Sequence, residues 1–174
     1  MKTTCAETLA FAALLALTGC GYQTAGHADL VPKNIKTIAI PPFTNTGVRY
    51  KLTESLGRAV TREFLTRTHY QVIQDINTAD AILSGAVVNF SSYPTIFDPA
   101  TGRASGAQVN VNLAITLMER TTGKLLFFRP NFEFKERYEI SVDPQAYFEE
   151  SEVAVDRLSR DAARSIVTAI LENF

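Results

Sequence analysis

The sequence predicts an α+β fold, a two-layer sandwich in which two helices pack on one face of a mostly antiparallel sheet of about four strands. Three observations lead to this prediction: a strictly alternating segment at residues 108–118, helical periodicity at 52–66, and a longer helical pattern from 144 to about 172. Each helix has one apolar stripe to bury, and the alternating strand offers one apolar face. A helical layer covering one side of the sheet satisfies both requirements.

The alternating segment is the clearest local pattern in the chain. Asn110, Asn112 and Thr116 point to one side, while the residues between and around them are apolar and point to the other. Such a period of two is typical of a strand with one buried and one wetter face. The predicted buried positions are Val109, Val111, Leu113, Ile115 and Leu117.

Further strands are expected on either side of this segment. They lie at residues 35–40, 70–74, 81–93 and 124–138. Pro41 and Pro42 end the first of them, and Thr121-Thr122-Gly123 forms a tight turn before the last. Pro130 interrupts the last strand and predicts a bulge, because proline cannot donate to the ladder.

The two predicted helices each carry one apolar face. In the first, over residues 52–66, that face is mostly apolar and consists of Leu52, Leu56, Ala59, Val60 and Glu63/Phe64. The second begins with Asp143 as its N-cap and Pro144 at its first position, and it runs to about Glu172. Its core face consists of Phe148, Val155, Leu158, Ala162, Ile166, Ala169 and Ile170. Its opposite face is charged, which predicts a solvated surface with (i, i+4) pairs such as Asp156–Arg160.

The N-terminal segment has the architecture of an export signal. Leu9 to Leu17 is an unbroken apolar run of nine residues, too short for a permanent membrane span, and small residues follow it. Residues 1–19 are therefore interpreted as a signal peptide whose removal leaves Cys20 first. Residues 20–34 are small and polar, as in a lipidated N-terminus and tether, and residues 35–174 form a single domain.

The stretch Leu17-Thr18-Gly19-Cys20 resembles the lipobox of bacterial lipoprotein precursors at all four positions. That resemblance implies a diacylglycerol on the sulfur of Cys20 and an acyl chain such as palmitate on its amine, which together anchor the chain durably. Gly21, in place of an aspartate, implies sorting to the outer membrane. Because Cys5 would leave with the signal, no disulfide is expected in the mature chain.

Composition argues against several function classes. The chain has 17 basic and 18 acidic residues, so no nucleic-acid partner is expected. Its two histidines, His27 and His69, have no metal-ligand spacing to another ligand, and no serine lies in a G-x-S-x-G elbow. We therefore expect no enzyme activity, no metal and no cofactor other than the lipid on Cys20.

The loop at residues 98–107 offers a candidate contact. It leads into a strand and not a helix, so it does not form a phosphate loop. One interpretation is a flexible hairpin tip. The other is a functional loop that presents Arg103, the sole charge between Asp98 and Glu119, to a partner. Arg49 and Lys51 form a second small basic cluster before the first helix.

The ordered features resemble one family. The lipobox with "CGYQTAG", the segments "LVPKNIKTIAIPPFTNTG" and "ADAILSGAVVNF", and the terminal "DPQAYFEESEVAVDRLSRDAARSIVTAILENF" are similar to the LptE family of lipopolysaccharide-assembly lipoproteins. The resemblance implies that the protein sits in the lumen of the LptD β-barrel at the outer membrane. There it would plug the barrel, help it assemble and bind lipopolysaccharide. Arg103, Arg49 and Lys51 are the candidate contacts to lipopolysaccharide or barrel.

A second interpretation remains open. "TIAIPPFTNTG" and "ADAILSGAVVNF" also resemble pieces of periplasmic regulators of peptidoglycan synthases and of the curli secretion lipoprotein. The alternative function is therefore a lipoprotein regulator of a peptidoglycan synthase or of other envelope machinery. The chain lacks the long Pro-rich tether of the former and the extra hairpins of the latter. Affinity capture distinguishes the two, because it recovers either a β-barrel or a synthase.

Overall fold

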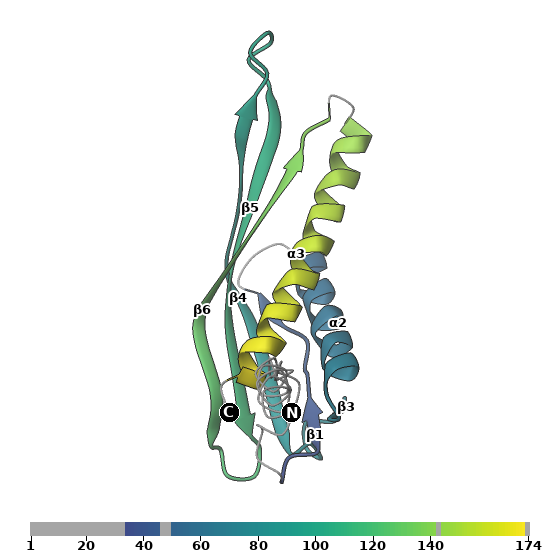
Figure 1. The fold of residues 1–174 in the computed structure, drawn as a ribbon, viewed down its shortest axis with the longest axis vertical. Helices are drawn as coiled ribbons and strands as arrows, with labels where there is room; N and C mark the ends of the chain where they lie inside the picture. Colours follow the sequence, from purple (N-terminus) through teal and green to yellow (C-terminus); the bar gives the residue numbers. More distant parts are fainter. Residues whose placement is uncertain (1–33, 46–49, 142–143, 173–174) are drawn as a thin grey trace, which may run out of the picture.

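The computed structural model describes residues 34–45, 50–141 and 144–172. Its elements follow the order β1 (Thr37–Ala39), β2 (Thr44–Asn45), α2 (Tyr50–Arg67), β3 (Gln71–Ile73), β4 (Ala81–Phe97), β5 (Ala104–Glu119), β6 (Leu125–Glu139) and α3 (Pro144–Glu172). Cys20, Arg49, Asp143 and the side chain of Phe148 lie outside the described part. The two helices of that part cover one face of the sheet, and the β4–β5 hairpin reaches past their ends (Figure 1).

The prediction of a mostly antiparallel sheet of about four strands is wrong, although the α+β class and the single helical layer are confirmed. The described residues form a mixed sheet of six strands in the order β3-β1-β4-β5-β6, with β2 paired to β4. The strands β3 and β4 both pair in parallel with β1. The cause is the segment β1–α2–β3, because a parallel pair needs a crossover and α2 supplies it.

The predicted register of β5 is confirmed. All five predicted apolar positions are buried, and Val111, Leu113, Ile115 and Leu117 are fully so. The antiparallel partners of Val111 are Phe90 on β4 and Phe134 on β6. The strand is longer than expected at both ends, and toward the hairpin tip it stays paired with β4 as far as Ala104, past the ends of the helices (Figure 1).

The bulge predicted at Pro130 is also present. Between Leu113 and Ile115, β5 advances two residues, whereas the partner positions on β6 advance three, from Phe132 to Arg129. Pro130 lies inside this irregularity, where no ladder hydrogen bond is needed from it. The strand β6 forms one edge of the sheet and has 15 residues.

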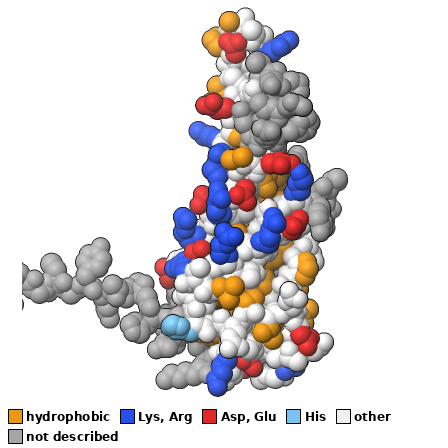
Figure 2. Space-filling model, turned by 90° about the vertical axis from the view of Figure 1, so that its right-hand side faces the viewer, with side chains coloured by type: hydrophobic (Ala, Val, Ile, Leu, Met, Phe, Trp, Pro, Cys, Tyr) orange, Lys and Arg blue, Asp and Glu red, His pale blue; other side chains and the backbone are white. Residues whose placement is uncertain are grey.

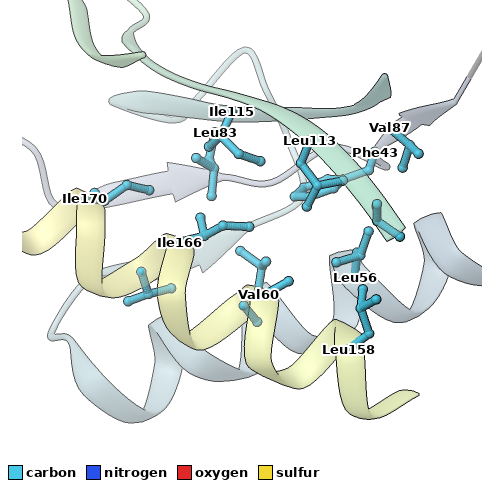
Figure 3. Packing of buried hydrophobic residues seen from close by; sticks show 14 of the residues in the cluster. Phe43, Leu56, Val60, Leu83, Val87, Leu113, Ile115, Leu158, Ile166 and Ile170 are labelled. Carbon is cyan, nitrogen blue, oxygen red and sulfur yellow. The ribbon is translucent and has the colours of Figure 1, made fainter. Parts of the chain in front are cut away.

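The core lies between the two helices and the covered face of the sheet (Figure 3). From α2 it takes Leu52, Leu56, Val60 and Phe64, and from α3 it takes Ala154, Leu158, Ala162, Ala163, Ile166, Val167 and Ile170. These positions recur at helical spacing, as the apolar stripes predict. Ala59, Val155 and Ala169, also predicted on these faces, are half-buried at the margin of the core.

One glycine in β4 is required by the packing of the core. A Cβ added to Gly85 would lie 2.5 Å from the ring of Phe43, which lies next to Val87 in the core (Figure 3). Phe43 is buried and comes immediately before β2. The missing side chain of Gly85 therefore lets the segment after β1 settle onto β4.

The charged face of α3 is solvated, as predicted. One of its ion pairs was expected from the sequence, and another was not. The expected pair Asp156–Arg160 is present at 2.8 Å. Arg157 turns away from its neighbour Asp156 and donates to Glu136 on β6 at 2.7 Å. Figure 2 shows Lys and Arg side chains gathered over this face, with Asp and Glu between them.

Candidate functional site

The distal end of the β4–β5 hairpin presents the predicted loop as an ordered turn. The backbone N–H of Asp98 donates to the carbonyl of Arg103, and the N–H of Gly102 donates to the carbonyl of Asp98, both at 2.8 Å. Gly102 has a φ of +67°, a left-handed conformation that glycine adopts without strain. The loop at the hairpin tip therefore has the geometry of a hydrogen-bonded turn.

Asp98 holds this turn together with its side chain. Its carboxylate accepts the hydroxyl of Thr101 at 2.6 Å and the N–H of Ala100 at 2.9 Å. These bonds favour the charged form and hold the pKa of Asp98 below its ordinary value. The negative charge nearest to Arg103 in sequence is thus engaged in shaping the loop.

Arg103 is exposed and lies directly before β5, which begins at Ala104. Within the described part of the chain its guanidinium has no ion-pair partner. Ile96 and Phe97 are more than half exposed on the opposite strand. The side chain of Ile96 lies against Gly106, where an added Cβ would be 3.1 Å away. The tip therefore combines one available cation with exposed apolar surface.

A polar network follows on the face of the sheet that the helices leave uncovered. Gln108 donates through Nε2 to the hydroxyl of Tyr93 at 3.0 Å and to Oδ1 of Asn110 at 2.8 Å. Its Oε1 accepts from Nε of Arg137 at 3.1 Å. Gln108 is 8% exposed, so these neighbours satisfy a nearly buried amide. The alternation in β5 predicts the polar side of this face but not its partners from β4 and β6.

Lys51 does not form one basic site with Arg103. Its ammonium group forms an ion pair with Glu152, which connects the first turn of α2 to α3. Arg49, its predicted companion, lies outside the described residues. The structure therefore separates the two predicted basic sites: one is at the hairpin tip and the other joins the helices.

An open groove of about 1320 Å³ runs along α2. Its walls come from α2, from residues 40–45 and from Gln74 and Ile76. Leu65 is 57% exposed there. Arg62 lies on the rim and has no ion pair with any described residue, although its neighbour Glu63 pairs with Arg67 at 3.5 Å. No sequence motif predicted this groove, since it forms where β1 and β3 end.

The described residues show no candidate metal site. No group of three His, Cys, Asp or Glu side chains in that part of the chain could hold a metal ion. His69 is exposed two residues after the end of α2. The arrangement can form hydrogen bonds, ion pairs and apolar contacts with a partner, which is the chemistry of a binding protein.

Comparison with solved structures shows a shared fold. A Xanthomonas campestris protein matches with a TM-score of 0.57 and 15% identity, over 83% of this chain and 89% of that one. Lipoprotein B from Nitrosomonas europaea gives 0.55 and 16%, over 79% and 88%. The rare lipoprotein B from Shewanella oneidensis gives 0.54 and 13%, over 76% and 94%.

Sequence comparison gives the family. A search of curated proteins finds no match. The family model described as "LptE: Lipopolysaccharide-assembly" matches residues 35–170, which include every strand and nearly all of both described helices. This chain therefore belongs to the LptE family.

Proposed function

We propose that this chain is an outer-membrane lipoprotein that plugs an LptD-like β-barrel, helps the barrel assemble and assists lipopolysaccharide transport to the cell surface. The observation that carries the proposal is the family match over residues 35–170. Family membership and the lipoprotein neighbours support an envelope lipoprotein of lipopolysaccharide assembly. The LptE family is non-catalytic, and the proposal contains no enzymatic step.

The described surface suits a position inside a barrel lumen. The interior of a large outer-membrane barrel is polar and water-filled, so a plug needs polar outer faces. The distal sheet face offers Tyr93, Asn110 and Arg137, and the helical face offers mixed charges (Figure 2). Among the described helices, none is long and apolar enough to span a membrane.

Arg103 is the proposed contact to lipopolysaccharide, which is an anionic amphiphile. Arginine suits phosphate because its planar guanidinium can donate two hydrogen bonds at once. Arg103 forms no ion pair with any described residue, and the carboxylate of Asp98, although ionised, accepts its hydrogen bonds from Thr101 and Ala100. Lys51 is proposed as a weaker contact because Glu152 already neutralises it. Arg49 stays a prediction from the sequence.

Affinity capture tests the barrel partner. The tagged, lipidated chain is solubilised from its own envelope with mild detergent, and the material that it retains is identified. We expect a large outer-membrane β-barrel in a fixed ratio to the chain. Recovery of a peptidoglycan synthase without a barrel would instead favour the alternative function.

A binding assay tests the lipopolysaccharide contact. A chain beginning at Gly21, without the lipid, is titrated with labelled lipopolysaccharide at low and high salt. A charge-assisted bond contributes about 1.5–3 kcal/mol, so Arg103→Glu should weaken binding about tenfold or more. Arg49→Glu with Lys51→Glu should have a smaller effect. Arg160→Glu is the matched control, because it makes the same charge change on the helical face. If Arg103→Glu binds like the control, the tip serves barrel contact or connection only.

A further inference from the structure

The groove along α2, here called the α2 groove, combines an apolar lining with two arginines. Leu65 on α2 and Ile76 after β3 are 57% and 40% exposed there. The apolar residues of the lining are Ile40, Pro41, Pro42, Phe43, Leu65 and Ile76. Figure 2 looks at the side of the molecule on which α2 lies and shows hydrophobic side chains next to Lys and Arg side chains. Apolar surface exposed in a concave site is typical of a place where a partner binds.

Gly57 lies inside α2 and lines the α2 groove. A glycine in a helix interior costs about 1 kcal/mol relative to alanine, because it loses more conformational freedom on folding. Nothing in the described chain requires this glycine, since its φ is not positive and an added Cβ would meet no described atom within 4 Å. A residue that breaks a local rule without an internal reason indicates an outside contact, and glycine lets a partner come close to the helix backbone.

Polar groups in the lining favour a polypeptide over a hydrocarbon chain. Thr53 and Thr61 lie one helical turn on either side of Gly57 and line the α2 groove with it. Within the described chain, the hydroxyl of Thr61 and the side-chain amide of Gln74, also in the lining, form no hydrogen bond. The N–H and C=O groups of a polypeptide backbone can bond to these groups, whereas an acyl chain would cover them without a partner.

The charges of the lining indicate which sign the occupant carries. Arg58 forms an ion pair with Glu54 at 3.3 Å, one turn earlier on α2. Arg62 forms none with any described residue. The lining thus has two arginines and one glutamate, which gives it a net charge of +1. Charge complementarity therefore predicts a carboxylate of the occupant next to Arg62.

A position inside a barrel restricts what can fill the α2 groove. The wall of a barrel curves around its plug, so its inner surface is concave toward the domain and cannot enter a concave groove. Outer-membrane barrels also carry long loops on their extracellular side, and in some barrels loops fold into the lumen. Such a loop can enter the α2 groove where the wall strands cannot. It would also remove Leu65 and Ile76 from the water of the lumen, which is favourable.

We propose that the α2 groove binds a loop of the LptD-like barrel that folds into the lumen. Apolar side chains of this loop contact Leu65 and Ile76, its backbone passes close to Gly57, and one of its carboxylates pairs with Arg62. This inference rests on the proposed barrel partner. It adds the surface by which the barrel holds this chain and the chemistry of the segment that does so.

Photo-crosslinking in the native envelope tests the occupant. The full-length chain is produced in its own host with the photoreactive residue p-benzoylphenylalanine in place of Leu65, inside the α2 groove. A second version carries it in place of Arg160, which is exposed on the charged face of α3. After irradiation the adducts are purified and mapped by mass spectrometry. We expect the Leu65 position to crosslink to a barrel loop that contains Asp or Glu, and the Arg160 position not to crosslink to that loop.

Filling the α2 groove tests the role of Gly57. Gly57→Leu should reduce the loop adduct several-fold, while the Tm of the unlipidated domain stays the same or rises, because leucine is the better helix former. Ser165→Leu is the matched control, since it adds the same side chain at an exposed position of α3 outside the groove. Arg62→Glu should also reduce the loop adduct several-fold, and Arg160→Glu should leave it unchanged. Melting curves check that every variant folds.

The outcomes separate the inference from the proposed function. If affinity capture of the unsubstituted chain recovers no barrel, the barrel partner is wrong and the inference falls with it. If the barrel is recovered but the Leu65 position gives no adduct, or crosslinks to a wall strand, to lipopolysaccharide or within its own chain, the barrel partner stands and the loop is overturned. An unchanged loop adduct in Gly57→Leu also overturns it. A loop adduct that falls in Gly57→Leu and Arg62→Glu, but not in the two controls, supports the α2 groove as the contact.

Discussion

Truncating Leu113 to alanine should destabilise the domain strongly. Leu113 has no exposed surface and lies between Val87 on β4 and Phe132 on β6, and its side chain faces the helical layer (Figure 3). The change removes three carbons at about 0.8 kcal/mol each, or about 2.4 kcal/mol, and it also leaves a cavity. With the cavity included, the loss of unfolding free energy should be about 4 kcal/mol. For a domain of this size that corresponds to a fall in Tm of about 10 °C or more.

Asn112→Ala provides the matched control at the adjacent position. Asn112 faces the uncovered side of the sheet and donates to Oδ1 of Asn131 at 2.6 Å. It is half-buried, so losing this bond should cost about 1 kcal/mol or less. Both variants are compared with the parent chain beginning at Gly21 by thermal and urea unfolding. Equal losses from Leu113→Ala and Asn112→Ala would refute the assigned register of β5.

Three further predictions follow from local geometry. The backbone N–H groups donating to Asp80 lower its pKa from the ordinary 3.8. The stability that the ionised carboxylate contributes is therefore present above about pH 4 and is lost as the pH falls through the pKa of Asp80 in the folded state. The Tm difference between the parent and Asp80→Asn should vanish in acid. A Tm difference that grows in acid would contradict the predicted direction. Gly85→Ala should lower Tm, because the added Cβ would clash with the ring of Phe43. Gly57→Ala in α2 meets no atom within 4 Å and should stabilise the domain by about 0.5–1 kcal/mol. Calorimetry that shows the reverse order of Tm would disprove the packing argument. Cys20→Ala should abolish metabolic labelling with a radioactive fatty acid, and a labelled variant would exclude Cys20 as the lipid site.

The sequence predicts those parts of the fold whose cause is local. The alternation of Val111, Leu113 and Ile115 determines which face of β5 is buried, and Pro130 produces the bulge because it lacks a donor. The parallel pairing of β1 with β3 and β4 was not predicted. It joins residues more than thirty positions apart, and three-residue strands such as Gln71–Ile73 carry too short a pattern to show their partner.

The candidate site was predictable to a similar extent. The exposure of Arg103 follows from its glycine-rich surroundings, but the turn that frees it depends on how Asp98 bonds to Thr101. The pairing of Lys51 with Glu152 spans 101 positions, so no neighbouring residue indicates it. Charges adjacent in sequence are a poor guide on helices, where partners lie three or four residues apart.

The free edge of β6 has a consequence for how the protein behaves at high concentration. Fifteen residues of unpaired edge would ordinarily serve as a template onto which a second chain could add a strand. Here Pro130 interrupts that template. Every second residue of the distal half of β6 is charged, so an added strand would bring its side chains against ionised groups; these residues are Glu133, Lys135, Arg137 and Glu139. The same bulge that fits β6 to its neighbour therefore also protects the domain from growing into fibres.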